Sequence, residues 1–426
     1  MMTGLRLAVR AVLLAAFAAA LGAGAHAAPP VQLVETRPVE AGLGNPKLPA
    51  ALDTWLELIR GARRSLDFEE FYLSTWPGEP TEDVLAALGQ AAGRGVRVRL
   101  LLDARMYRTY PRTADSLAAV GGFEVRLVDF GRLAGGVQHS KFFLVDSDAV
   151  FLGSQNFDWR ALKHIHELGV LVRDRRVAAE FQRVFEMDWA AASPAGQPPD
   201  TTLALRPVQV TRAAGELPIR LVQAPGDTVS LWPSYSPRGA IPDSNLWDRD
   251  LIVRTLDGAR REIVLQVLSY AVAGRRERDD TLDAALRRAA ARGVKVKLIV
   301  SDWVTGSSGL ADLQSLARAP NLEVKLSTVP EWSGGYIPFA RVEHCKYLVA
   351  DTLWTWVGTS NWEGSYFHNA RNLAVTLRNR PLAEAARAVF ETSWTAPGAR
   401  PLDPDAKYEP KVRGEEPPPG KKKYGG

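Results

Sequence analysis

The sequence predicts an α/β protein built from two tandem lobes, each a mixed β-sheet flanked by helices. Three observations predict this class. Segments of the first half recur in the same order in the second half, helical and strand patterns alternate within each half, and each half contains an apolar strand that begins with a histidine and a lysine. A conserved order of several segments is typical of duplication. Alternating helices and strands are typical of sheets covered by helices.

The repeated segments predict the elements of each lobe in order. A helix (LAALGQAAG in the first half, LDAALRRAAA in the second) runs into an R-G-V turn, whose glycine, Gly95 or Gly293, favours a left-handed helix stop. A β-branched strand follows, VRVRLLLD or VKVKLIVSD, and then a second strand, GFEVRLVD or NLEVKLST. The amphipathic segments FQRVFEMDWAA and EAARAVFETSWTA predict the helices that close the lobes.

Composition along the chain predicts the domain boundaries. Arg6 and Arg10, an apolar alanine-rich run and an A-H-A site have the pattern of a secretory signal, so we expect cleavage after Ala27 and export to the periplasm or the outside of the cell. A processed chain would have no stable membrane span. The predicted parts are a signal peptide at 1–27, an N-terminal lobe at 28–195, a linker leading into the second lobe at 196–243, a C-terminal lobe at 244–400 and a disordered basic tail at 401–426.

Charge and cysteine content exclude some classes of function. The formal charge of +5 includes the leader arginines and the GKKKYGG tail, so the folded body is close to neutral. Such a body gives no case for binding duplex nucleic acid or an anionic membrane. Cys345 is the only cysteine, which excludes an intramolecular disulfide, and an exported chain of this kind depends on its core for stability.

Two copies of one motif carry the candidate chemistry. In HSKFFLVD, His139 and Lys141 lie two positions apart and therefore share a face of a regular strand, whereas Asp146 points to the other face as a supporting carboxylate. The second copy, HCKYLVAD, consists of His344, Lys346 and Asp351.

Each motif is followed by a glycine and two small polar residues on a turn. These are Ser154 and Asn156 in the first copy and Thr359 and Asn361 in the second. Each half therefore offers an imidazole, an ammonium, a hydroxyl and an amide near a strand end, which together form an anion site with a titratable group. A single copy would be explained by a solvent-facing strand end, but the full set in both copies favours chemistry over packing.

The doubled pattern H-x-K-x-x-x-x-D with G-S/T-x-N resembles the phospholipase D superfamily over nearly all of the mature chain. GSQNFDWRALKHIHELGV and IPFARVEHCKYLVADTLWTWVGTSNWEGSYF are similar to lysosomal members that act as 5′-exonucleases on single-stranded nucleic acid. The resemblance implies two phospholipase D-like lobes related by a pseudo-twofold axis, with one active site between them. It also implies no metal and no other cofactor.

The resemblance also implies a mechanism. One histidine attacks phosphorus to form a phosphohistidine, and the other protonates the leaving alcohol and then activates water. Both chemistries suit an imidazole near neutral pH. The motif lysines, with the predicted phosphate-binding residues Ser154, Asn156, Thr359 and Asn361, would supply positive charge and hydrogen-bond donors to the phosphoryl oxygens.

One position breaks the symmetry of the two copies. In the family, an acidic residue downstream of each motif reaches across to the histidine of the other lobe. The matching positions here are Glu167 and Asn372. We expect Glu167 to raise the pKa of His344 and favour an acid role, while His139, without a carboxylate, stays neutral as the nucleophile.

Three functions are compatible with these motifs. The first is hydrolysis or transfer at phospholipid head groups, the second is a 5′-exonuclease on single strands, and the third is a catalytically inactive binding scaffold. The partner of the first two is a phosphodiester substrate, and protein partners stay unknown from the sequence. Two intact motifs argue against the scaffold, whereas the motifs themselves do not separate lipid from nucleic acid.

Other residues gave weaker signals. Trp332, Tyr336 and Phe339, in the loop before the second motif, are candidates for a substrate wall, although loop anchors in a core would look the same. His164 and His166 alternate around an isoleucine. With no cysteine nearby in the sequence and no second histidine cluster, they do not predict a metal site.

Overall fold

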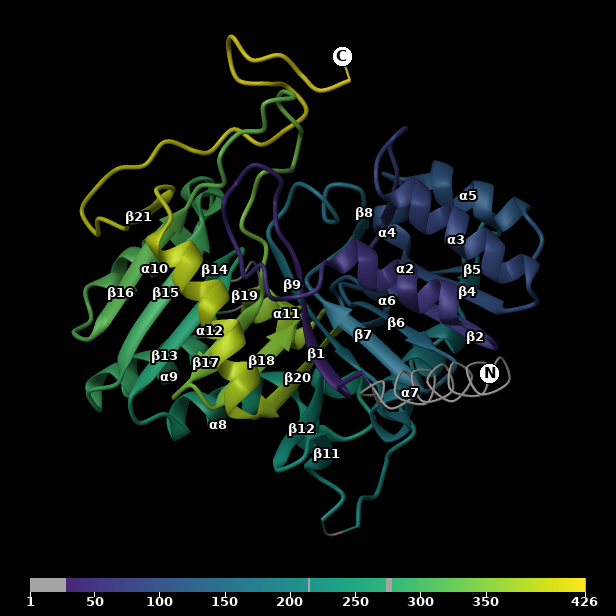
Figure 1. The fold of residues 1–426 in the computed structure, drawn as a ribbon, viewed down its shortest axis with the longest axis horizontal. Coiled ribbons are helices and arrows are strands. Elements are labelled where there is room, and N and C mark those ends of the chain that lie inside the picture. The colour runs from purple at the N-terminus through teal and green to yellow at the C-terminus, as the bar shows by residue number, and fades with distance from the viewer. Residues whose placement is uncertain (1–27, 214, 273–277, 426) are drawn as a thin grey trace, which may run out of the picture.

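The computed structural model describes residues 28–213, 215–272 and 278–425. The predicted signal peptide lies outside these residues. Figure 1 shows two lobes side by side, the blue N-terminal lobe on the right and the green C-terminal lobe on the left, each with helices over a sheet. The predicted α/β class with two lobes and mixed sheets is confirmed.

The N-terminal lobe contains an eight-stranded sheet. Its strands are β1 (Val31–Thr36), β2 (Ser65–Glu70), β4 (Arg97–Asp103), β5 (Phe123–Val128), β6 (Lys141–Val145), β7 (Ala149–Gly153), β9 (Glu167–Val172) and β10 (Ser193–Pro194). Its helices are α2 (Ala51–Gly61), α3 (Thr81–Gly93), α4 (Ala104–Tyr107), α5 (Pro111–Ala119), α6 (Phe130–Leu133) and α7 (Arg175–Ala190). A separate two-stranded ribbon pairs β3 (Leu73–Ser74) with β8 (Phe157–Asp158).

The C-terminal lobe contains a nine-stranded sheet. Its strands are β11 (Ile219–Ala224), β12 (Asp227–Ser236), β13 (Glu262–Val267), β15 (Lys295–Ser301), β16 (Leu322–Ser327), β17 (Tyr347–Ala350), β18 (Trp354–Gly358), β20 (Asn372–Arg378) and β21 (Ala399–Pro401). Its helices are α8 (Asp248–Gly258), α9 (Thr281–Ala291), α10 (Gly309–Ala317), α11 (Gly364–His368) and α12 (Arg380–Thr395), with 3-10 turns η1 (Arg238–Ala240), η2 (Ser244–Leu246) and η3 (Asp302–Gly306). The ribbon here pairs β14 (Tyr270–Ala271) with β19 (Trp362–Glu363).

The two sheets share one topology. The order β9-β7-β6-β2-β4-β5-β10 in the first corresponds to β20-β18-β17-β13-β15-β16-β21 in the second. In both, three strands run parallel and the motif hairpin runs antiparallel beside them. The helix stops at Gly95 and Gly293 have φ values of +87° and +89°, as the R-G-V turns predict. The duplication predicted from the sequence therefore extends to the order and direction of the strands.

One predicted lobe boundary differs from the structure and another fits it. Strands β11 and β12 join the C-terminal sheet through β20, so the second lobe begins near residue 219 and not at 244. The region predicted as a linker therefore supplies the edge strand β11 and its neighbour β12. The expected end of the N-terminal lobe at 195 fits β10, which pairs with β5.

The tail also differs from its predicted disorder, because it packs on the C-terminal lobe. The Tyr424 backbone N–H donates to Tyr336 O at 2.9 Å, and the Tyr424 ring lies 5.0 Å from that of Trp332. Lys411 forms an ion pair with Asp302 at 2.9 Å. Aromatic contacts and paired charges hold this basic segment, whose composition alone predicts no order.

The lobes meet across a buried seam. Arg371, directly before β20, is fully buried and forms a two-bond ion pair with Asp188 of α7, with N···O distances of 2.6 and 2.8 Å. One apolar core cluster runs through both lobes, from Val31 of β1 to Leu402. The strands that carry the motifs are thus fixed from both sides of the seam.

Candidate active site

Both motif histidines lie at the seam, at the starts of equivalent strands. His139 precedes β6 and His344 precedes β17, and the two residues are only 4% and 8% exposed. Each histidine is held by the backbone of the opposite lobe. His139 N–H donates to Arg371 O at 2.9 Å, and His344 N–H donates to His166 O at 3.0 Å. The structure therefore brings the two motifs together through reciprocal contacts across the lobes.

The motif lysines lie beside their histidines, as the alternation of a strand requires. Lys141 Nζ donates to His139 O and Lys346 Nζ to His344 O, both at 2.7 Å. Burial lowers the pKa of Lys141 well below its usual range, and the charge of Lys346 lowers it further. Burial also lowers the pKa of Lys346, to about 8. Two buried ammonium groups of this kind favour a bound anion, because an anion compensates the charge that burial penalises.

Asn372 fixes the tautomer of His139. Its Nδ2 donates to Tyr366 O at 2.9 Å, so its Oδ1 must be the atom that faces His139 Nδ1, at 2.9 Å. An amide oxygen only accepts hydrogen bonds, which assigns the ring proton of His139 to Nδ1. Burial and the charges of the two motif lysines lower the pKa of His139 well below its ordinary value. The neutral ring therefore carries an unprotonated Nε2, the form that a nucleophile needs.

Glu167 holds the ring of His344, as predicted, with both carboxylate oxygens within 2.9 Å of Nδ1. The predicted rise in the pKa of His344 is wrong. Burial and the charges of Lys346 and Lys141 lower that pKa well below its ordinary value. Burial raises the pKa of Glu167 well above its ordinary value. Both shifts favour an uncharged pair of His344 and Glu167 over an imidazolium beside a carboxylate.

The two motif histidines therefore have different partners at Nδ1. His139 faces the amide oxygen of Asn372, and His344 faces the carboxyl group of Glu167. This difference between the copies makes the two imidazoles chemically unequal.

The sequence predicts that Ser154 and Thr359 bind phosphate. In the structure, their hydroxyls instead form hydrogen bonds with the strands behind the histidines. Ser154 Oγ accepts from Leu168 N at 3.0 Å, and Thr359 Oγ1 accepts from Leu373 N at 3.1 Å. Thr359 Oγ1 also donates to Asn372 Oδ1 at 2.9 Å. Both side chains are fully buried. Their hydroxyls therefore position the groups at 167 and 372.

Asn156 and Asn361 are both nearly buried. In the part of the chain that the structure describes, their Oδ1 atoms have no hydrogen-bond partner. An amide oxygen accepts hydrogen bonds and cannot donate to a phosphoryl oxygen, so the predicted phosphate-binding role depends on the Nδ2 groups of these two side chains.

Asp146 and Asp351 lie at the far ends of β6 and β17, about 16 Å along the strand from the lysines at roughly 3.3 Å per residue. The carboxylate of Asp146 accepts from the backbone N–H groups of residues 63–65 at 2.6–2.9 Å. That of Asp351 accepts from residues 260–262 at 2.8–3.1 Å. The prediction that they point away from the reactive pair agrees with this position, and their contacts hold loops and not imidazoles.

Two aromatic rings beside His139 were missed by sequence reasoning. Phe71 lies 4.9 Å and Tyr366 lies 4.8 Å from the imidazole, both edge-on. Neither belongs to a repeated motif. The only sequence signal was their place, Phe71 directly after β2 and Tyr366 shortly after the second G-T-S-N. These two rings give the imidazole of His139 an apolar contact surface.

The predicted substrate wall does not form as expected. The ring of Trp332 lies between His164, at 4.6 Å, and Tyr424, at 5.0 Å. Tyr336 Oη donates to Gly414 O at 2.8 Å. Both residues anchor the C-terminal tail, whereas Phe339 is 39% exposed.

His166 belongs to a cluster that a metal would fit by residue type. Within the described residues, ligand atoms of His166, Glu343 and Cys345 lie within 4.8 Å of one another, although Cys345 is distant in sequence. Both ring nitrogens of His166 are already hydrogen-bonded, Nδ1 to Glu343 at 2.8 Å and Nε2 to Glu35 at 3.0 Å. The cluster is the counterpart of Arg371 with Asp188, a cation from one lobe among carboxylates. It is therefore explained as a buried ion pair.

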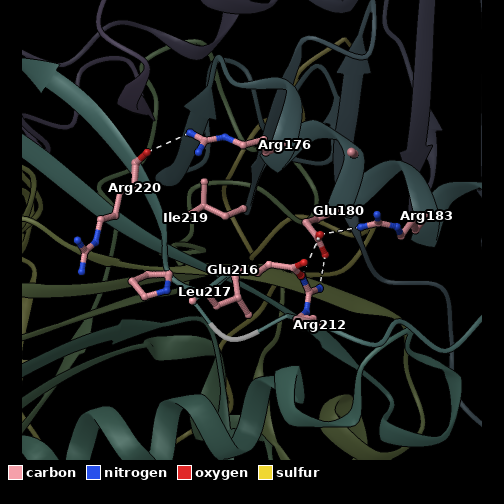
Figure 2. Close-up of a pocket in the computed structure, with 11 residues that line it drawn as sticks. Arg176, Glu180, Arg183, Arg212, Glu216, Leu217, Ile219 and Arg220 are labelled. Atoms are coloured by element: carbon pink, nitrogen blue, oxygen red, sulfur yellow. Dashed lines mark hydrogen bonds and ion pairs between the residues drawn. The ribbon is translucent and has the colours of Figure 1, made fainter.

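A large pocket of about 820 Å³ lies away from the motifs, between α7 and the segment before β11 (Figure 2). Glu180 pairs there with Arg183 at 2.6 Å and with Arg212 at 2.5 Å. Arg176 reaches the backbone oxygen of Arg220. Its lining contains none of the motif residues, and these paired arginines offer little free charge to a substrate.

Comparisons with known proteins fit this geometry. The family model described as cardiolipin synthase, PLD-like domain, matches twice, at residues 55–189 and 252–394. The chain belongs to the phospholipase D superfamily. The two matches cover the two lobes, each with its own motif.

Several members of this superfamily are similar over most of the chain. The 5'-3' exonuclease PLD3 of Bos taurus is 32% identical over 88% of this chain and 81% of the relative. The same enzyme of Homo sapiens is 32% identical over 86% and 78%. Phospholipase D Z of Dictyostelium discoideum is 29% identical over 87% and 90%.

A solved structure supports the superfamily fold. Phosphatidylserine synthase of Haemophilus influenzae matches with a TM-score of 0.61 over 83% of this chain and 85% of its own, at 14% identity. The described residues contain no helix long and apolar enough to cross a membrane. As a phospholipase D superfamily member with both motifs, the chain is a phosphodiesterase.

Proposed function

We propose that the chain is an exported 5′-exonuclease that hydrolyses single-stranded nucleic acid through a phosphohistidine on His139. The observation that carries this proposal is the pair of motif histidines with unequal Nδ1 partners, an amide oxygen of Asn372 for His139 and the carboxyl group of Glu167 for His344. We infer from it a bare Nε2 on His139 and an Nε2–H on His344. The substrate class is supported by the exonuclease names of the PLD3 relatives.

In the first step, the lone pair of His139 Nε2 attacks phosphorus and forms a P–N bond. The P–O bond to the leaving alcohol breaks, and that oxygen takes the proton of His344 Nε2. The Glu167 carboxyl proton can move to Nδ1 of His344 as this happens, which keeps the ring neutral. General acid catalysis of this kind contributes about 10²–10⁴-fold.

In the second step, His344 Nε2 takes a proton from water as the water oxygen attacks phosphorus. The P–N bond breaks, His139 regains its lone pair, and Glu167 recovers its proton from Nδ1. The ammonium groups of Lys141 and Lys346 stabilise the charge that develops on the phosphoryl oxygens in both steps.

Trapping the intermediate tests the assignment of the two histidines. The substrate is an oligonucleotide that carries ³²P at its first internucleotide phosphate, counted from the 5′ end. After brief exposure to it, a His344→Ala variant should accumulate phosphoenzyme, and mass spectrometry should locate the phosphoryl group on His139. A His139→Ala variant should hold none. Label on His344 in the wild-type enzyme would reverse the assignment.

The substrate is tested by direct competition between classes. The mature enzyme is given a 5′-hydroxyl single strand, the same sequence as a duplex, and phosphatidylcholine micelles, each with and without EDTA. We expect mononucleotides from the single strand only, unchanged by EDTA. Choline release without nucleotide release would favour the second candidate, a head-group phospholipase, which is supported by the name of the Dictyostelium relative.

Export is tested on the intact gene product. Amino-terminal sequencing of the protein from the secreted or periplasmic fraction should begin at residue 28. A cytoplasmic protein that retains residues 1–27 would contradict export and leave the catalytic proposal standing.

A further inference from the structure

A pocket of about 170 Å³ is lined by aromatic rings of the N-terminal lobe and the tail, with Ile337 and Pro338 from the C-terminal lobe. Its aromatic walls are Trp76, Tyr110, Trp159 and Tyr424. Trp159 lies 6.2 Å from Trp76 and 6.0 Å from Tyr424 between ring centroids. Trp76 is 40% exposed, so the pocket has an open edge.

Consecutive contacts join this pocket to the nucleophile candidate. The ring of Phe71, which lies 4.9 Å from His139, is 5.7 Å from Tyr72. Tyr72 in turn stacks on the pocket residue Tyr110 at 5.0 Å. Trp159 also follows Asn156 closely in the chain, through the short strand β8 that pairs with β3. These contacts place the pocket a few side chains away from His139.

The charges that line the pocket are balanced. Arg160 pairs with Asp158 at 2.8 Å and lies over the rings of Tyr110 and Trp159, at 5.9 and 5.8 Å. Lys423 pairs with Glu415 at 3.0 Å. Paired cations give little attraction for a phosphate group. They also disfavour a quaternary ammonium head group, which aromatic cages bind by their negative ring faces.

Size and shape favour a planar ring. A cavity of roughly 150 Å³ holds one benzene molecule, so a space of this volume suits a single flat group. Aromatic side chains beside a single-strand path stack on bases with little regard to sequence.

We infer that the Trp76–Tyr110–Trp159 pocket is a stacking subsite for one nucleobase of the substrate strand. This inference rests on the proposed nuclease function. It assigns the pocket to a base some distance from the scissile phosphate, because Phe71 and Tyr72 separate it from His139. Stacking in this pocket would add binding affinity for a single strand of any sequence. The near-neutral body of the protein would otherwise bind such a strand weakly.

The test moves a single abasic site along a 5′-hydroxyl oligonucleotide, one position at a time. For the wild-type enzyme, removal of the base at one position should lower kcat/KM for the first cleavage by about 5- to 150-fold, the range for a lost base–aromatic stack. In Trp76→Ala, an abasic site at that position should no longer lower kcat/KM. The intact oligonucleotide should then be cleaved with the same low kcat/KM that the wild-type enzyme shows for the abasic one. Trp76→Phe should retain most of the wild-type pattern.

Matched controls keep the outcomes distinct. Trp232→Ala removes a part-exposed tryptophan that stacks on Trp354 in the C-terminal sheet, and it should leave the abasic profile unchanged. Nuclease activity with no position-dependent abasic effect, or with the same effect in Trp76→Ala, overturns the subsite and leaves the proposed function intact. No nuclease activity, with phosphatidylcholine turnover that falls in Trp76→Ala, overturns both and assigns the pocket to a choline head group.

Discussion

At the scale of single residues, the amide at 372 separates the roles of the two histidines. Asn372 accepts the Nδ1 proton of His139 because Tyr366 O takes its own N–H. Replacing it by leucine removes the acceptor and the control of the tautomer, so we expect kcat to fall by about 10²–10⁴-fold. Asn372→Asp keeps an acceptor but favours the imidazolium of His139. Its acid limb in kcat/KM should therefore move to higher pH, as measured by a full pH profile; an unchanged limb would contradict the role of this amide.

Lys346 predicts the alkaline limit of activity. Its pKa is lowered to about 8 by burial, so the charged form exists below that pH and is lost above it. Because kcat/KM reports the free enzyme, it should decline as the pH rises through about 8. Lys346→Met should be weakly active, and any alkaline limb that it keeps should come from Lys141, whose pKa burial also lowers. A wild-type plateau that continues to strongly alkaline pH would show that the ammonium is not needed.

At the scale of elements, Asp146 ties the end of β6 to the turn between α2 and β2. Its carboxylate accepts from backbone N–H groups of residues 63–65, which lowers its pKa despite partial burial. We expect Asp146→Ala to cost about 1–3 kcal/mol of unfolding free energy, measured by urea denaturation, with kcat within a few-fold of wild type. Asp148→Ala, which removes exposed ion pairs with Arg64 and Arg175, should cost less than about 1 kcal/mol. A large loss of kcat in stable Asp146→Ala would place this carboxylate in the chemistry.

The sequence predicted these elements well where its patterns were local. Strand alternation placed His139 with Lys141, and the R-G-V turns placed the helix stops. The predictions failed where the outcome depends on the other lobe. Ser154 looked like a phosphate ligand, but its hydroxyl is used by β9. The pKa of His344 was predicted from its one carboxylate partner, whereas burial and two lysines determine it.

At the scale of the whole molecule, the ion pair of Arg371 and Asp188 joins the lobes. Both side chains are fully buried, so Arg371→Met leaves an unpaired buried carboxylate and should cost about 3–5 kcal/mol of unfolding free energy. The double variant Arg371→Met/Asp188→Leu should recover much of this loss in the same urea experiment. A single variant as stable as wild type would show that the seam does not depend on this pair.

Distance along the chain explains what could not be predicted about this seam. Arg371 and His166 occupy equivalent places in the two copies, yet their partners come from elements far away in sequence, α7 for one and β1 with the second motif for the other. Nothing in the repeated segments marks residues 188, 35 or 343 as partners. The ordered structure of the tail could not be predicted for the same reason. Tyr424 contacts Trp332 and Tyr336, which are distant in the sequence.

The reciprocal backbone contacts at the seam have a consequence for how the enzyme fails. His139 is held by Arg371 O and His344 by His166 O, so any parting of the lobes releases both rings at once. A molecule with parted lobes would then have no phosphodiesterase activity, because neither histidine would be in place. An open molecule could neither form the phosphohistidine nor hydrolyse it. Closure of the two lobes is therefore a condition for each turnover.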